Sequence, residues 1–240
     1  MKSYLIILIL IGIVLISSCI MRETQPEIQK TTTMTEKTPE RKISENLIAE
    51  NIFSSDILES FKLSPDGKRV AYINILDDKQ SCVVDGKEGK QYEGIGKGTL
   101  VFSPDSRRIA YAAQVGNKWI VVVDGIEEKQ YDGIGIPIFS PNSKRMAYMV
   151  QIDDRQFVVV DGKEGKQYEG IGEGTLVFSP DSRRIAYAAQ MGDKWVVVVD
   201  EIEGKQYDSL FGEGIIFDSS NGLHYLATSG TGIYAIQEEN

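Results

Sequence analysis

Few side chains in this sequence of 240 residues are suited to catalysis, and they do not form a recognisable set. The only histidine, His224, lies in the last of a series of repeats. An ungapped alignment gives it the position of Ile109 in an earlier repeat, and a one-residue slip gives it that of Arg108, both on a predicted strand. Ser219 and Ser220 fall in a predicted turn and no nucleophile motif surrounds them. We therefore expect His224 to be structural or superficial, and the sequence predicts no catalytic residue.

Metal ligands are also scarce in the sequence. Cys82 occupies a position that is valine in the other repeats, which favours a small core residue over a nucleophile or a zinc ligand. Acidic residues recur in predicted turns, namely Asp77, Asp78, Asp153, Asp154 and Asp193. Calcium takes about six to eight oxygens from a shaped loop, and no Asp-x-Asp-x-Asp-Gly spacing occurs here. We expect solvated turn residues, with no metal site and no cofactor.

Two tryptophans are the side chains best suited to contact a partner. Trp119 and Trp195 each stand five residues before a recurring aspartate, and two other repeats carry Gln80 and Gln156 at this position. Tryptophan and glutamine therefore alternate from one repeat to the next. Beside glycine-rich loops on one face of the predicted fold, the two indole rings could contact a peptide or a glycan. Packing between repeats is the alternative explanation.

The first nineteen residues resemble a secretory signal. The stretch from Tyr4 to Ile16 carries no charge; it is short for a membrane span of about 20 residues but typical of the apolar region of a signal. The Ile-Ser-Ser-Cys sequence that ends at Cys19 resembles the lipobox of bacterial-type lipoproteins, in which this cysteine is lipidated. An uncleaved signal anchor is the alternative. Both interpretations place the rest of the chain outside the cytoplasm, tethered to a membrane.

Residues 20–46 are predicted to form a disordered linker. They are rich in threonine and charge and contain too little apolar material to offset the conformational entropy of the chain. The net charge of the whole chain is −9. An acidic surface repels phosphate backbones, so we expect no nucleic-acid partner.

Internal repeats decide the predicted fold. A Ser-Pro-(Asp/Asn) motif followed by an apolar residue, Ala and Tyr recurs about every 38 residues, and its copies begin at Ser64, Ser103, Ser140, Ser179 and, in degenerate form, Asp218. A Lys-Gln-Tyr motif ends at Tyr92, Tyr131, Tyr168 and Tyr207. Each period has room for four short strands. The sequence predicts an all-β fold over residues 47–240, a single β-propeller of about five four-stranded blades with repeats starting near 60, 98, 136, 174 and 213.

The last repeat has room for only three strands. We expect residues 47–53 to supply the fourth, because Phe53 stands eleven residues before Ser64, as most Lys-Gln-Tyr tyrosines stand before the next turn motif. This pairing would close the ring and remove exposed sheet edges. Residues 87–131 and 163–207 are identical at 39 of 45 positions, which indicates a duplicated pair of blades.

The fullest copies of the repeat, Ser-Pro-Asp-Ser-Arg-Arg-Ile-Ala-Tyr, resemble the WD40-like propeller repeats of the TolB family over residues 47–240. That family includes periplasmic envelope proteins and the non-catalytic propeller domains of some peptidases, so the resemblance is specific for fold and unspecific for function. The fifth copy departs from the pattern between Asp218 and Gly222, which leaves the geometry of its blade open.

Together these features predict a non-catalytic protein-binding or scaffold module of the cell envelope. It would be membrane-anchored through its N-terminus and would bind an envelope or extracellular protein. Two alternatives remain open. One is an enzyme, such as a hydrolase or lyase, with a site in the propeller channel, and the other is a purely structural accessory lipoprotein.

Overall fold

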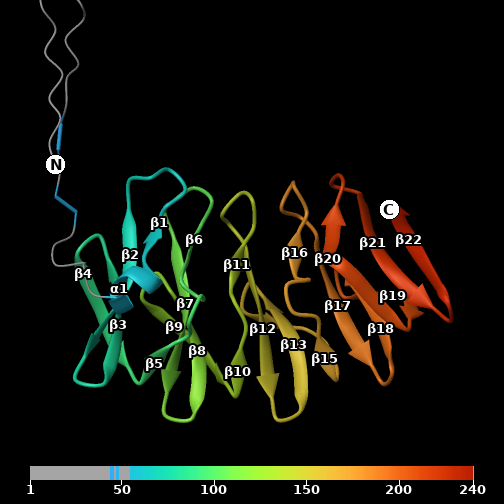
Figure 1. The fold of residues 1–240 in the computed structure, drawn as a ribbon, viewed down its shortest axis with the longest axis horizontal. Coiled ribbons are helices and arrows are strands. Elements are labelled where there is room, and N and C mark those ends of the chain that lie inside the picture. Colours follow the sequence, from blue (N-terminus) through green and yellow to red (C-terminus); the bar gives the residue numbers. More distant parts are fainter. Residues whose placement is uncertain (1–43, 46, 49–54, 240) are drawn as a thin grey trace, which may run out of the picture. The chain divides into compact units, whose positions relative to one another are not determined.

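Strands make up most of the structure, a computed structural model that describes residues 44–45, 47–48 and 55–239. Nearly all of these residues belong to one unit, Glu45–Asn240. The described part contains one helix, α1 (Ser55–Ser60), and strands β1 to β22 in five antiparallel sheets (Figure 1). The predicted all-β fold with about five blades is confirmed. The predicted signal, its Cys19 and the linker up to residue 43 lie outside the described residues.

Each sheet holds the strands of one repeat. The first sheet consists of β1 (Lys62–Leu63), β2 (Val70–Leu76), β3 (Lys79–Val84) and β4 (Lys87–Tyr92). The second consists of β5 (Gly94–Ile95), β6 (Val101–Phe102), β7 (Ile109–Val115), β8 (Lys118–Val123) and β9 (Ile126–Tyr131). The third consists of β10 (Gly133–Ile134), β11 (Ile138–Phe139), β12 (Met146–Ile152), β13 (Arg155–Val160) and β14 (Lys163–Glu164). The fourth consists of β15 (Gly170–Ile171), β16 (Val177–Phe178), β17 (Ile185–Met191), β18 (Lys194–Val199) and β19 (Ile202–Tyr207), and the last of β20 (Ser209–Phe217), β21 (Gly222–Ser229) and β22 (Gly232–Glu239).

The first strand of each middle sheet is split into two short pieces. In the second sheet both β5 and β6 pair with β7, so five named strands make a four-stranded blade. The third and fourth sheets repeat this arrangement.

Recurring aspartates fix the turn after the third strand of the first four blades. Asp124 and Gly125 have φ of 53° and 82°, the left-handed conformation of a tight hairpin turn. The Asp124 carboxylate accepts one hydrogen bond from the Ile109 N–H at 2.9 Å and another from Arg108 Nε at 3.0 Å. The same carboxylate thus holds both the turn and the start of the neighbouring strand, which explains why the aspartate recurs with the repeat.

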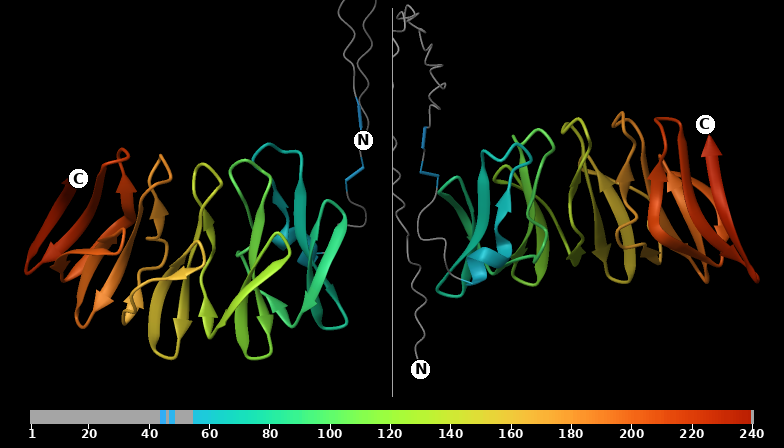
Figure 2. Two further views of the ribbon diagram at one scale, coloured as in Figure 1. Left: turned by 180° about the vertical axis from the view of Figure 1, so that it is seen from behind. Right: turned by 45° about the horizontal axis from the view of Figure 1, so that its top comes forward.

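The hydrophobic core lies between consecutive sheets. Where the second sheet faces the third, Val121 and Tyr131 pack with Tyr148 and Phe157. The rings of Tyr131 and Phe157 meet edge to face with their centroids 5.9 Å apart. A corresponding cluster lies at each of the other three junctions. Figure 2 shows the sheets from two further sides, side by side in chain order, so each sheet is stabilised mainly by its neighbours.

The predicted closure of the ring is wrong for the described part of the chain. The last sheet has three strands, and Leu47 and Ile48 lie in no strand. The Ile48 carbonyl lies against the first sheet, since a Cβ added to Gly86 would meet its oxygen at 2.9 Å. The rest of the segment, residues 49–54, lies outside the described residues. Figure 1 shows the first and last sheets at opposite ends of the row.

Helix α1 explains why the first sheet needs no preceding blade. Ile57 of α1, with Phe61, packs against Tyr72 and Val83 on the side of the first sheet that faces away from the second. On the same side, Ser81 stands where the second sheet has Ile120 in its core, and it donates a hydrogen bond to Glu88 at 2.6 Å. A helical cover and a polar substitution therefore cap this end, as terminal repeats of an array require.

Candidate interaction surface

Both tryptophans lie at the entrance of a third strand, as predicted. Trp119 on β8 pairs with Gln114 and Tyr131, and Trp195 has the same place on β18. Both side chains are half-buried, and Trp195 packs against the core between the fourth and last sheets. They lie in different sheets with the third sheet between them, so the structure does not bring them into one cluster.

The alternating glutamines show what this position does in the other two sheets. The Gln80 side-chain oxygen accepts the Ile95 N–H at 2.6 Å, and Gln156 accepts the Ile171 N–H at 2.7 Å. Each bond crosses from one sheet to the first strand of the next. Glutamine therefore fastens two of the junctions through a hydrogen bond, while Trp195 contributes to a third by packing.

Charged side chains on the same loops are paired with one another. Lys118 Nζ lies 2.5 Å from Asp132 Oδ1, and the other carboxylate oxygen accepts the N–H of Asp153 in the next sheet at 2.9 Å. The ammonium of Lys118 is the main reason why the pKa of Asp132 lies below its usual range. Lys194 and Asp208 repeat this contact, and Asp208 accepts the Gly230 N–H at 2.6 Å. These carboxylates serve the junctions between sheets.

Three of the acidic residues predicted to lie in turns have the backbone conformation of a turn. Asp77, Asp78 and Asp153 have φ of 48°, 61° and 49°, in the left-handed region that aspartate tolerates better than most residues. Within the described residues, no group of three or more histidine, cysteine, aspartate or glutamate side chains is placed to hold a metal ion.

His224 lies one position beyond the ungapped alignment considered above and two beyond the slipped one. Leu223 and Tyr225 pack in the core of the fourth junction, as Ile109 and Tyr111 do in the first, so His224 takes the place of Ala110. The turn from Asp218 to Gly222 is one residue shorter than the Ser-Pro-Asp turn, which produces this shift. His224 Nδ1 lies 2.7 Å from Asp218 Oδ1, so this contact spans the same turn.

Cys82 is a core residue in the first junction, only 2% exposed. Burial raises the pKa of its thiol to about 12, which disfavours the thiolate that a nucleophile or a metal ligand needs.

Sequence reasoning missed a set of three-residue contacts between neighbouring outer strands. The Tyr92 hydroxyl and Lys90 Nζ both reach Glu127 Oε1 in the next sheet, at 3.0 and 2.6 Å. Two further junctions have the same arrangement, with Lys129, Tyr131 and Glu164 in one and Lys166, Tyr168 and Glu203 in the other. The recurrence of a glutamate 33 or 35 residues after the tyrosine of each of these Lys-Gln-Tyr motifs was the available signal. We call each set a Lys–Tyr–Glu clasp.

No helix among the described residues is both long and apolar enough to span a membrane. Lipidation of Cys19 and the interaction of the two tryptophans with a partner remain predictions.

Comparison with known proteins finds similar solved structures but no related sequence. No protein-family model matches the chain, and no curated protein matches its sequence. TolB from Acinetobacter baumannii is similar in structure, with a TM-score of 0.45 and 12% identity over 75% of this chain and 51% of TolB. The β-propeller domain of the Trilobed protease from Pyrococcus furiosus, described as having an open velcro topology, gives 0.40 and 13% over 74% of this chain and 67% of that domain. The acylaminoacyl peptidase of Pyrococcus horikoshii gives 0.41 and 13% over 71% and 37%.

The chain thus spans about half the length of the TolB structure. The five antiparallel sheets of the chain itself, arranged side by side as blades (Figure 1), agree with the propeller that the repeats predicted. The resemblance to TolB concerns the fold alone.

Proposed function

We propose that this chain is a protein-binding module that presents its blades to an envelope or extracellular protein. One observation carries the proposal: most of the large apolar side chains left exposed in the described part lie at the two ends of the array, with Ile126, Ile136 and Ile202 on the middle sheets as the exceptions. At the first end they are Leu58, Leu63, Ile75 and Leu76, and at the last end Phe211, Ile216, Leu226, Ile233 and Tyr234. Contiguous exposed apolar surface of this kind usually marks an interaction site.

A non-catalytic role fits the chemistry of the candidate residues. The single histidine of the chain contacts Asp218 on the rim of the last sheet, and the Cys82 thiol is buried. On the loop face the carboxylates of Asp132 and Asp208 are engaged with lysines and backbone N–H groups. We propose that Cys19 carries the lipid that tethers the chain to the outer side of a membrane, where residues 20–46 would hold the propeller away from the surface.

Site-specific photo-crosslinking in the native envelope tests the binding proposal. A photo-reactive phenylalanine replaces Ile233 on the last sheet or, as a matched control, Ile126 on the second sheet; both side chains are 71% exposed. We expect a discrete, saturable crosslinked protein from position 233 and not from position 126. Equal crosslinking at the two positions, or none at position 233, would contradict the proposal.

The contribution of the loop face is tested separately. In the Trp119→Gln and Trp195→Gln variants, glutamine replaces tryptophan as it does naturally in the alternate sheets, which protects the fold. If the tryptophans contact the partner, the double variant loses the crosslink seen with the unchanged loop face. An unaltered crosslink yield assigns the tryptophans to packing between sheets.

A further inference from the structure

Lys–Tyr–Glu clasps occur at the first three junctions between the described sheets and not at the fourth. At each of the first three junctions, a lysine and a tyrosine on the outer edge of one sheet bind a glutamate on the outer strand of the next. The lysine ammonium is the first cause of the lowered pKa of these glutamates. The clasp is thus a carboxylate site built from two side chains of the preceding blade.

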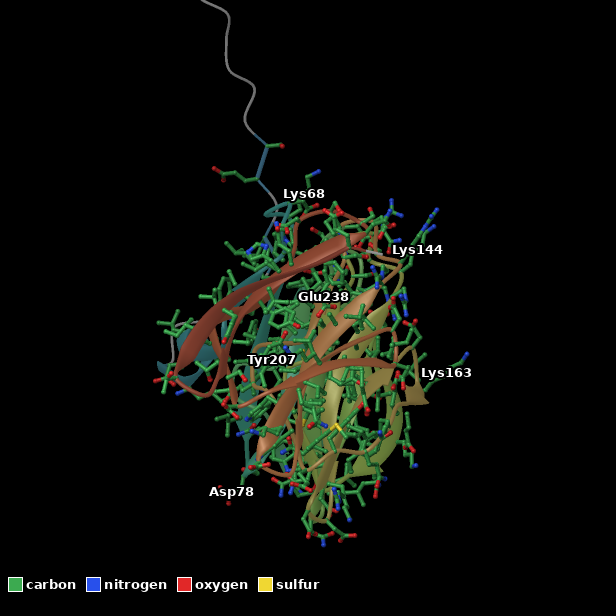
Figure 3. The ribbon with its side chains drawn as sticks, turned by 90° about the vertical axis from the view of Figure 1, so that its right-hand side faces the viewer. Lys68, Asp78, Lys144, Lys163, Tyr207 and Glu238 are labelled. Atoms are coloured by element: carbon green, nitrogen blue, oxygen red, sulfur yellow. The ribbon has the colours of Figure 1, made fainter. Side chains whose placement is uncertain are left out.

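The fourth outer strand carries the same two side chains without the carboxylate. Lys205 and Tyr207 on β19 repeat the motif, and Lys205 Nζ lies 5.5 Å from the centroid of the Tyr207 ring. Lys205 is exposed, and in the described part of the chain it forms no ion pair. The nearby Glu238 carboxylate is held by the Tyr225 hydroxyl at 2.6 Å. Figure 3 views the array from this end, with Tyr207 and Glu238 labelled.

The glutamate is absent here because the last sheet has no fourth strand among the described residues. Its order is β20-β21-β22, so no described strand pairs with the far edge of β22 over Gly232–Glu239. An edge of this length offers a row of backbone donors and acceptors to an extended peptide.

The strand register shows which position of an added strand would carry the missing carboxylate. In the second sheet Tyr111 pairs with Val122, and Val122 pairs with Glu127. In the last sheet Tyr225 pairs with Ile236. A strand added antiparallel to β22 would therefore present the residue opposite Ile236 to Lys205 and Tyr207.

The neighbouring apolar face fits the rest of such a strand. In the second sheet the outer-strand Tyr131 stands opposite Trp119, and by the same register the matching position on β22 is Ile233. Phe211 and Leu226 lie opposite each other on this face and are 48% and 42% exposed. An aromatic side chain of the added strand would cover this apolar surface.

We propose that β22 binds an extended segment of a partner protein as a fourth strand, with a glutamate opposite Ile236 that completes the clasp of Lys205 and Tyr207. The inference rests on the proposed protein-binding function and names the chemistry of the partner. The outer strands of a second copy, β4, β9, β14 and β19, each pair within their own sheets, so a second copy that met this edge would do so through its own β22. The described N-terminal residues lie at the first sheet, where the Ile48 carbonyl meets Gly86.

The first test uses a fluorescent peptide with the sequence of residues 124–134, which contains the strand β9 and its glutamate. Fluorescence anisotropy with the full chain is expected to show saturable binding. A peptide with Lys in place of Glu127 should bind at least five-fold more weakly. The Lys205→Glu variant should reverse this preference, whereas Lys163→Glu, an equal charge change on an exposed lysine of β14, should leave it unchanged. Lack of binding, or binding without charge preference, overturns the inference.

The second test identifies the occupant directly. A zero-length carbodiimide crosslinker joins amines to carboxylates in contact, and we expect it to link Lys205 to the peptide glutamate. A link from Lys205 to a carboxylate of residues 45–54 of its own chain, or to a second copy, overturns the inference in favour of that occupant. If the photo-crosslink at position 233 persists in Lys205→Glu, the protein-binding function stands and only the clasp is excluded.

Discussion

Single polar side chains fasten each sheet to the next, and their loss should weaken the array in a measurable way. The Ser143 hydroxyl is 4% exposed and accepts the N–H of Asp105 in the preceding sheet at 2.9 Å. Ser106 and Ser182 do the same at the junctions on either side. The first repeat has Gly67 at this position, and the described part of the chain has no preceding blade for it to bind. The serine is thus present in the repeats that bind a preceding sheet and absent from the first repeat, although the first repeat has the same turn.

Ser143→Ala should destabilise the fold by about 1–3 kcal/mol, because it leaves the Asp105 N–H without its acceptor. Alanine and serine meet a similar penalty at the φ of 63° at this position, so the backbone contributes little to the difference. Ser209→Ala is the control, since that hydroxyl donates only to the adjacent Leu210 carbonyl at 3.4 Å. Urea unfolding of both variants measures the effect, and equal midpoints would contradict it.

The clasps predict a dependence of stability on pH. Lys90 and Tyr92 hold the pKa of Glu127 below its ordinary value of 4.5 in the folded chain. A group whose pKa is depressed on folding stabilises the fold above its unfolded pKa, and this contribution disappears as pH falls through the folded pKa. The stabilisation is therefore present at neutral pH and is lost from about pH 4.5 downwards.

Glu127→Gln should lower stability at pH 7 and leave it nearly unchanged at low pH, so the difference from the natural chain shrinks on acidification. Urea midpoints measured between pH 3 and 7 test this. Glu173→Gln is the control because Glu173 is exposed and forms no ion pair in the described part of the chain. A difference that is constant across the whole pH range would show that the clasp is not the cause.

At the level of elements, α1 decides how the array begins. Ile57 is 9% exposed and lies against Tyr72 and Val83, whereas its neighbour Leu58 is 54% exposed. Removing the first side chain should uncover the free side of the first sheet, while removing the second should not.

Ile57→Ala should cost about 2–4 kcal/mol locally, because a buried aliphatic side chain is lost and a cavity is left. Hydrogen exchange should then quicken in β2 and β3 before it does in β7 and β8, since distant sheets have their own cores. Leu58→Ala, a change of the same size on the same helix, should leave exchange unaltered. Uniform acceleration over all five sheets would argue against α1 acting as a local cap.

The sequence predicted the strands well and the ends of the array poorly, for physical reasons. Alternating apolar residues and Asp-Gly turns are local signals, so each repeat reveals its own four strands. The helix that caps the first sheet has only six residues, Ser55–Ser60, which is too short to show a helical repeat of apolar residues in the sequence. Closure of the ring depends on which sheet edge, far away in the sequence, pairs with the N-terminal segment. The spacing between Phe53 and the first turn motif could not predict that edge. For the same reason the clasps, which join residues 33 to 37 positions apart, were not predicted.

The molecule as a whole is built from pairs of blades and not from single ones. Facing residues at successive junctions alternate in size, with Ile73 against Ala113, then Ala112 on the side that meets Val150, then Met149 against Ala189. Glutamine and tryptophan alternate with the same period. Across the first three junctions a large side chain from one sheet thus meets a small one from the next and the order reverses each time, whereas the fourth junction has Ala188 and Ala227 at these positions. Among the first four sheets the two-blade unit is therefore the smallest that can be exchanged.

Deletion of residues 87–162 should therefore give a shorter array that still folds. It removes two blades and joins Gly86 to a segment, 163–172, whose sequence is identical to 87–96, so the first sheet keeps its outer strand. Ile73 then meets Ala189 in place of Ala113, and the size match is preserved. Stability in an array follows the sum of its units and junctions, so the urea m-value should fall roughly in proportion to the surface buried.

Deletion of residues 87–125 is the matched comparison, because it removes a single blade and joins Gly86 to the outer strand β9. Ile73 would then face the third sheet with its larger Val150 and Phe157, and overpacking of this kind typically costs about 1–3 kcal/mol. Circular dichroism and urea unfolding should show a cooperative β-sheet transition for the two-blade deletion and a weaker, broader one for the single-blade deletion. Greater stability of the single-blade deletion would contradict the pairing of blades, because its junctions would then tolerate any neighbour.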